Sequence, residues 1–186
     1  MNKILQQYAT DIKRHCDTLD LASISSALEL IEAAYHENRQ IFIAGNGGSA
    51  ATANHFSCDF SKNAVKNSER KPKLISLSTN IEYLTAIGND IDYNCVFSKQ
   101  LQNLMNDGDL VILISASGNS PNVVNAAEYA KSKNGKLISL TGFDGGHIGK
   151  ISDVSINVPV NSYEQAEDMH MIILHMFVSH FKALGL

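Results

Sequence analysis

Short apolar runs alternate with helical patterns along most of this chain, and this alternation constrains the fold more than any other feature. Helical segments separate the runs, among them one from Pro121 to Lys133 that ends at the stop signal Asn134-Gly135. The runs have the length and composition of buried strands, and they cover residues 40–44, 74–77, 110–114, 137–140 and 154–158. Strands alternating with helices form right-handed crossovers. The sequence therefore predicts an α/β fold, a three-layer αβα sandwich around a mostly parallel five-stranded sheet.

Helical periodicity also brackets the strands. Apolar residues recur at helical spacing near Ile4 to Ile12 and again near Leu21 to Ile31, which predicts an N-terminal helical hairpin. A final helix is predicted from about Ser162 to Leu184. No linker, repeat or low-complexity tract interrupts the pattern, so we expect one domain over residues 1–186.

Two polar turns follow predicted strands and have the composition of anion sites. The first is Gly45-Asn46-Gly47-Gly48-Ser49-Ala50, and the second is Ser115-Ala116-Ser117-Gly118-Asn119-Ser120-Pro121. Glycines let backbone N–H groups converge, and the helix that follows each turn adds partial positive charge. Two such turns beyond the carboxyl ends of strands indicate one phosphorylated ligand. The alternative is purely steric, because Gly and Ser are common in strand-to-helix turns. Neither turn matches the dinucleotide or Walker pattern, which disfavours a nucleotide.

Charge and composition exclude several classes of partner. The net charge is −4 and no stripe of Lys or Arg is present, so the usual attraction to nucleic acid or to an anionic membrane is missing. No apolar run approaches the length of a membrane span. The three cysteines are widely spaced and odd in number, which predicts reduced thiols. We therefore expect a cytoplasmic protein that binds neither nucleic acid nor membrane.

Four side chains at helical spacing could form a metal and acid/base site. His55 and Asp59 are four residues apart, and Glu167 and His175 are eight apart, so each pair shares one helix face. Two imidazoles and two carboxylates suit zinc or another divalent first-row metal. Spacing alone also fits a solvated surface pair, a half-buried histidine and an acidic first turn that complements a helix dipole.

Motifs spread over nearly the whole chain resemble the sugar isomerase (SIS) domain family, and within it the phosphoheptose isomerases. They are GNGGSAATANHF, LTAIGND, VFSKQL, GDLVILISASGNSPNV, LTGFDGG and EDMHMIILH, in that order. The resemblance implies a flavodoxin-like SIS fold and a homotetramer with sites at subunit interfaces. It also implies reversible conversion of sedoheptulose 7-phosphate to D-glycero-D-manno-heptose 7-phosphate, which supplies heptose for bacterial surface polysaccharide.

The resemblance carries roles onto individual positions. The residues it implies in substrate binding are Asn46, Gly47, Gly48, Ser49, His55, Asp59, Asn89, Asp90, Ser115, Ala116, Ser117, Ser120 and Glu167. Among these, the serines would hold the phosphate, and Ala116 stands where Thr is frequent. The family's zinc ligands fall on His55, Asp59, Glu167 and His175, with Asp59 as the base and His175 as the acid of an enediol(ate) proton transfer.

Two positions depart from the family's pattern, and they keep other functions open. Asp59 stands where Glu is typical and Glu167 where Gln is typical. Asp is one methylene shorter, and a displacement of about 1 Å can cost about a hundredfold in rate. The alternatives are an isomerase of another sugar phosphate and a non-catalytic SIS scaffold resembling the DnaA initiator-associating protein. Retention of both histidines favours an isomerase, because a scaffold has no chemical need for them.

Overall fold

One parallel sheet organises the computed structural model, which describes residues 2–186. Its strand order is β2-β1-β3-β4-β5, and each of the four pairings found in this part of the chain is parallel. The strands are β1 (Gln40–Gly45), β2 (Lys73–Ser76), β3 (Leu110–Ser115), β4 (Lys136–Thr141) and β5 (Val154–Asn157). The predicted five-stranded α/β fold is confirmed, and the order places β1 and β3, which precede the two polar turns, side by side.

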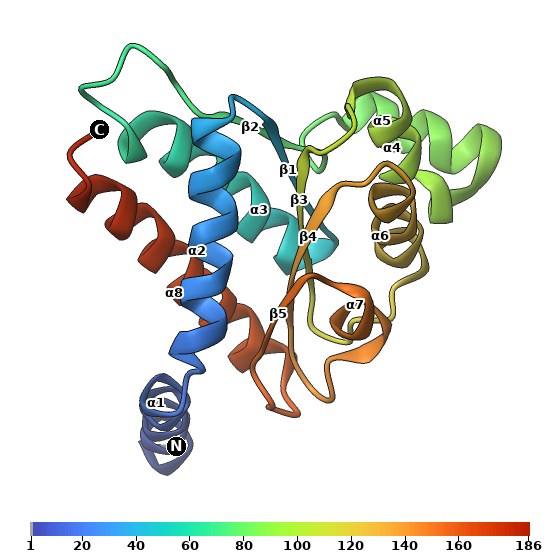
Figure 1. The fold of residues 1–186 in the computed structure, drawn as a ribbon. Helices are drawn as coiled ribbons and strands as arrows, with labels where there is room; N and C mark the ends of the chain where they lie inside the picture. Colours follow the sequence, from blue (N-terminus) through green and yellow to red (C-terminus); the bar gives the residue numbers. More distant parts are fainter. Residues whose placement is uncertain (1) are drawn as a thin grey trace.

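Helices cover both faces of this sheet (Figure 1). On one face lie α2 (Leu21–His36), α3 (Gly47–Asp59) with the π-helical turn η1 (Phe60–Ala64), and α8 (Tyr163–Ala183). The other face carries α4 (Ile81–Ile87), η2 (Gly88–Asp92), η3 (Tyr93–Cys95), α5 (Ser98–Leu104), α6 (Pro121–Ser132) and α7 (Gly146–Ile151). Between residues 2 and 186, no helix is both long enough and apolar enough to cross a membrane.

Alternation along the strands divides the core into two layers. In β1, Ile41 and Ile43 pack beneath α2, α3 and α8, whereas Phe42 and Ala44 pack beneath α5 and α6. This is the period of two that a strand imposes on its side chains. Every residue of β3 is buried, as expected for the central strand of a parallel sheet covered on both faces.

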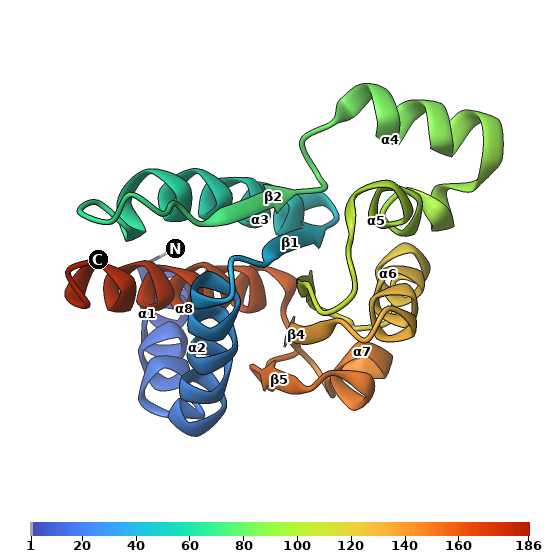
Figure 2. The same ribbon diagram turned by 45° about the horizontal axis from the view of Figure 1, so that its top comes forward.

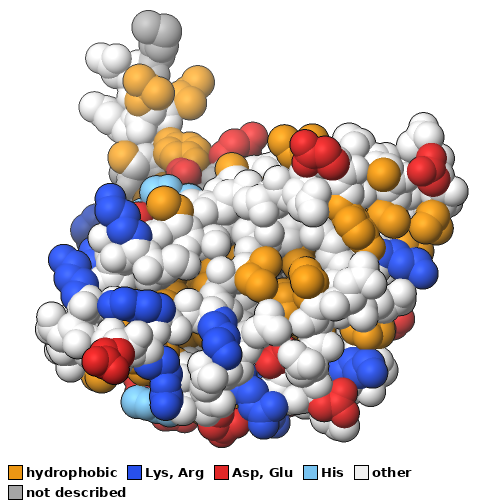
Figure 3. Space-filling view, turned by 90° about the horizontal axis from the view of Figure 1, so that it is seen from above, with side chains coloured by type: hydrophobic (Ala, Val, Ile, Leu, Met, Phe, Trp, Pro, Cys, Tyr) orange, Lys and Arg blue, Asp and Glu red, His pale blue; other side chains and the backbone are white. Residues whose placement is uncertain are grey.

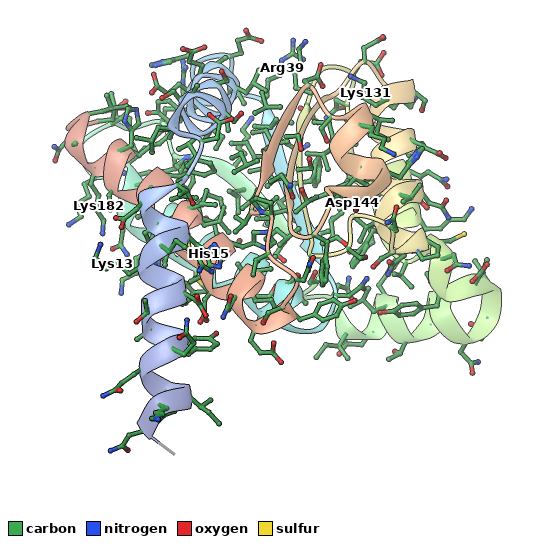
Figure 4. All side chains as sticks on the ribbon, turned by 90° about the horizontal axis from the view of Figure 1, so that it is seen from below. Lys13, His15, Arg39, Lys131, Asp144 and Lys182 are labelled. Atoms are coloured by element: carbon green, nitrogen blue, oxygen red, sulfur yellow. The ribbon has the colours of Figure 1, made fainter. Side chains whose placement is uncertain are left out.

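The two N-terminal helices form as predicted, but the first does not fold back along the second. Helix α1 (Asn2–Asp17) runs crosswise to α2 and projects from the body, packing mainly against α8 (Figures 1 and 4). The Tyr8 hydroxyl donates to Asp168 Oδ2 at 2.7 Å. Ile4 is 76% exposed and Leu5 66%, and Figure 3 shows apolar side chains on the projecting part. The chain turns at Asp20, whose carboxylate caps α2. The apolar side chains in the first half of α1 are therefore exposed in a single chain, whereas Ile12 and Cys16 further along it pack against the core.

Candidate active site

The first polar turn leads directly from β1 into α3. Asn46 is the N-cap of α3 but makes no side-chain capping bond, which leaves its carboxamide free for other contacts. Gly47 follows with φ of +54°, a conformation that glycine adopts without strain. Ser49, in the first turn of α3, is buried. The N-terminus of α3 therefore points its free N–H groups toward the carboxyl end of the sheet.

The second polar turn joins β3 to α6 and is folded tightly on itself. Gly118 N donates to Ser115 Oγ at 3.2 Å, and Ser115 Oγ lies 3.5 Å from Ser120 Oγ. Ser120 is the N-cap of α6, with Pro121 as the first helical residue, but its hydroxyl makes no capping bond. Gly118 has φ of +63°, and a Cβ there would overlap the carbonyl oxygen of Gly145. Ser115 Oγ and Ser117 Oγ each accept a backbone N–H, which leaves their O–H groups available to donate to a ligand.

A cavity of about 150 Å³ lies between the two turns and the start of α8. Its lining residues are Asn46, Ser49, Ile114, Ser115, Ala116, Ser117, Ser120, Tyr163 and Glu167. Seven of these nine are predicted substrate-binding residues, so the structure brings both turns to one place. Within residues 2–186, no Lys or Arg lines this cavity. An anion bound here would be held by hydroxyls, amides and two helix N-termini.

Glu167 reaches this cavity from α8. A Cβ on Gly48 would overlap the Glu167 carboxylate, so the glycine makes room for it. Partial burial raises the pKa of Glu167, and the neighbouring carboxylates of Glu164 and Asp168 raise it further. Glu167 is thus an acidic group beside the cavity whose charged form is disfavoured.

His55 and Asp59 of α3 meet His175 of α8 where these two helices pack beside each other. The two Nε2 atoms are 3.0 Å apart. Asp59 Oδ2 lies 3.4 Å from His55 Nε2 and 3.8 Å from His175 Nε2. The three side chains are between 30% and 48% exposed, so solvent or a ligand can reach them. We name this group the donor cluster.

The donor cluster fits a divalent first-row metal. Its three donor atoms lie within 4.8 Å of one another. A tetrahedral zinc bound at about 2.0–2.1 Å holds its donors roughly 3.3 Å apart, close to the spacing seen here. Three protein ligands and one open position are typical of catalytic zinc, whereas structural sites use four.

The fourth predicted ligand, Glu167, is not part of the donor cluster. It precedes His175 by eight residues on one helix, which corresponds to about 12 Å of rise. In one chain it lines the cavity beside Gly48 instead. Helical spacing indicated that Glu167 and His175 share one face of α8. It did not indicate that Glu167 lies at the cavity and His175 in the donor cluster, two separate places along this face.

Two further predicted substrate contacts, Asn89 and Asp90, do not line the cavity. Both are exposed on η2, where Asn89 Nδ2 donates to Asp90 Oδ1 at 2.8 Å. Figure 2 shows this segment with α4 as an arm beyond the β2 edge of the sheet. Their role in binding stays a prediction.

Besides Ile114, whose strand was predicted but not its place in the cavity wall, sequence reasoning missed three residues at or next to the cavity. Tyr163 lines it, and Asn122 and Tyr93 both form hydrogen bonds to the Asn46 side chain. Asn122 is 1% exposed, although an Asn in the first turn of a helix is usually solvated. Its burial depends on the other polar turn, so no local pattern could reveal it.

Comparisons with known proteins agree with this architecture. The chain matches the SIS domain model over residues 6–142. The protein therefore belongs to the SIS domain family of α/β proteins. Curated relatives of the chain within that family are named phosphoheptose isomerases.

One such relative, from Geobacter sp. (strain M21), is 35% identical, with 93% of each chain covered. Another, from Aliarcobacter butzleri, is 43% identical over 73% of this chain and 71% of its own. The solved structure of phosphoheptose isomerase GmhA from Neisseria gonorrhoeae has a TM-score of 0.89 at 31% identity and covers 98% of both chains.

Proposed function

We propose that the protein is a ketose/aldose phosphate isomerase that interconverts sedoheptulose 7-phosphate and D-glycero-D-manno-heptose 7-phosphate. The names of its relatives support this activity. The observation that carries the proposal is the presence of two different places along one pair of helices: a cavity suited to phosphate and a cluster suited to proton transfer.

The separation of these two places supports a long sugar phosphate. Ser49 lines the cavity, and His55 and Asp59 follow it on α3 after about 9 Å and 15 Å of helical rise. A ligand that uses both places therefore carries its phosphate and its reacting carbonyl at opposite ends. A seven-carbon 7-phosphate that isomerises between C1 and C2 meets this condition. A shorter sugar phosphate is the alternative.

Asp59 and His175 carry the proton transfers in this proposal. Asp59 takes a proton from C1 of the ketose, which gives an enediol(ate), and returns it to C2, while His175 moves a proton between the two oxygens. Asp59 Oδ2 faces both imidazoles, whereas Oδ1, within residues 2–186, has only a long contact of 3.5 Å from Asn63. Oδ1 is therefore the oxygen free to act as the base.

The metal in this proposal is one zinc ion held by His55, Asp59 and His175. When bound, it supplies positive charge that stabilises developing negative charge on substrate oxygens. The retained pair of imidazole donors also favours the isomerase over the scaffold function, which has no need of a donor cluster.

Replacement of Glu167 by Gln is expected to tighten sugar-phosphate binding by about three- to tenfold, because it removes an anionic group beside the bound phosphate. Zinc content, measured by mass spectrometry on the same sample, is expected to stay at one per chain, whereas His55→Ala loses it. Glu164→Gln is the matched control, since Glu164 is exposed and does not line the cavity. Loss of zinc from Glu167→Gln would return Glu167 to the ligand set, contributed by a second copy.

We further propose a cytoplasmic homotetramer with sites at subunit interfaces, whose product feeds heptose synthesis for surface polysaccharide. Exposed apolar side chains support assembly. They are Ile4 and Leu5 on α1, Ile81 at the start of α4, and Ile91, which follows Asp90 on η2. Free thiols at Cys16, Cys58 and Cys95 are typical of a reducing compartment. Light scattering on the purified protein tests the assembly, and a monomeric mass would contradict it.

Incubation of the metal-characterised protein with sedoheptulose 7-phosphate in deuterated water tests the activity. NMR is expected to show an aldoheptose anomeric signal and deuterium at the carbon beside the carbonyl. Bound but unconverted ligand would contradict the proposal. Pentose and hexose phosphates in the same assay separate a different isomerase from a scaffold.

A further inference from the structure

Two side chains that belong to neither polar-turn motif hold the Asn46 carboxamide. Asn46 Nδ2 donates to Asn122 Oδ1 at 2.9 Å, and Asn122 Nδ2 donates back to Asn46 Oδ1 at 2.9 Å. The Tyr93 hydroxyl donates to the same Asn46 Oδ1 at 3.1 Å. Since Asn46 lines the cavity, residues from α6 and η3 meet at one amide in the cavity wall.

The hydrogen bonds of the Asn46 side chain leave one of its groups for a ligand. A carboxamide oxygen accepts two hydrogen bonds and its NH₂ group donates two. Asn122 and Tyr93 fill both acceptor positions of Asn46 Oδ1, and Asn122 takes one of the two N–H groups. The second N–H has no partner among the residues that the structure describes. Asn46 therefore offers the cavity a donor and no acceptor, which suits a phosphate oxygen.

Helix α6 fixes both partners of Asn46. Asn122 is 1% exposed in its first turn, directly after the second polar turn. One turn further, Asn125 Nδ2 donates to the carbonyl oxygen of Asn94 at 2.9 Å, which ties η3 and its Tyr93 to the same helix. Helix α6 therefore fixes the positions of both polar turns and of the η3 segment relative to one another.

We propose that Asn122 and Tyr93 are positioning residues that hold Asn46 as a hydrogen-bond donor to the phosphate of the substrate. The inference rests on the proposed function for the identity of the sugar, but the phosphate contact itself does not require turnover. Inorganic phosphate is therefore a probe that tests the positioning role even when isomerase activity is absent.

Tyr93→Phe gives the first test. Loss of one neutral hydrogen bond corresponds to about two- to tenfold in affinity. We expect the Kd for inorganic phosphate and the KM for sedoheptulose 7-phosphate to rise by this factor. The melting temperature is expected to stay unchanged because Tyr93 is exposed, and kcat because a phosphate contact is made equally in the ground state and the transition state. The matched control is Tyr83→Phe, whose hydroxyl accepts from Asn103 away from the cavity. Equal affinity for phosphate in Tyr93→Phe and the wild type would overturn the role of Tyr93.

A double-mutant cycle between positions 46 and 122 gives the second test. Asn122→Ala is expected to weaken phosphate binding about tenfold in the wild type and to have no further effect in an Asn46→Ala background. Additive losses would show that Asn122 acts without Asn46 and would overturn the proposal. If Asn122→Ala does not fold, Tyr93→Phe combined with Asn46→Ala decides by the same criterion.

Discussion

Replacement of Asp59 by Asn is expected to lower kcat by about 10²–10⁴-fold, the usual contribution of a positioned general base. Asn has nearly the same size and can still donate or accept hydrogen bonds, but it cannot take a proton from carbon. The cavity is lined by other residues, so the Kd for the sugar phosphate is expected to stay within about twofold. NMR assays of product at fixed times measure kcat, and calorimetric titration measures Kd.

Asp59→Glu is the informative companion, because it restores the longer side chain that phosphoheptose isomerases typically carry. It is expected to keep measurable turnover, because Glu retains a carboxylate that can take the proton, even where a shift of about 1 Å lowers the rate by up to about a hundredfold. Zinc content measured on each variant separates loss of the base from loss of metal. Wild-type turnover in Asp59→Asn would place the base elsewhere, with Glu167 as the next acidic group.

Acid is expected to destabilise the protein through one buried histidine on α8. His170 is fully buried, and neither ring nitrogen has a hydrogen-bond partner within residues 2–186. Burial lowers the pKa of His170 from 6.5 to about 4, opposed only by the backbone at Thr141. Between these values the unfolded chain binds a proton that the folded chain does not. Above about pH 6.5 His170 is neutral in both states and does not lower the free energy of unfolding. As the pH drops from there to about 4, this free energy falls by about 3 kcal/mol.

His170→Phe removes this titration while keeping a planar side chain in the core. Urea unfolding of both proteins at several pH values is expected to show their difference in stability growing as the pH falls from 6.5 to 4, in favour of the variant. Parallel curves over this range would mean that His170 is protonated in the folded protein or exposed in solution.

The sheet was predictable from the sequence because buried parallel strands appear as short, continuous apolar runs. The run Leu110 to Ile114 is apolar throughout, and it is the fully buried strand β3. The exposure of α1 could not be predicted in this way. Ile4 and Leu5 follow the periodicity of a buried helix, although both are exposed here. Periodicity reports which residues share a face, and it does not report what covers that face.

The parts of the candidate site that lie on a single helix were predictable from the sequence. The parts where side chains of several elements come together were less predictable. His55 and Asp59 lie one turn apart on α3, and spacing found them. The reciprocal amide pair of Asn46 and Asn122 joins residues 76 apart in the chain, and no spacing rule reaches that far. Glu167 shares a helix with His175, but its neighbour is Gly48, a contact that only the packing of α3 on α8 creates.

The proposed phosphate cavity has no Lys or Arg among the lining residues within 2–186, which affects how an anionic ligand arrives. Arg39 and Lys131 lie toward the opposite end of the sheet (Figure 4), and the whole chain carries a net charge of −4. Long-range steering of an anion therefore contributes little to the association rate, which should respond weakly to ionic strength. Hydroxyls and helix N-termini act only over the last few ångströms. Selection of the phosphate therefore takes place after encounter, by hydrogen-bond geometry rather than by charge.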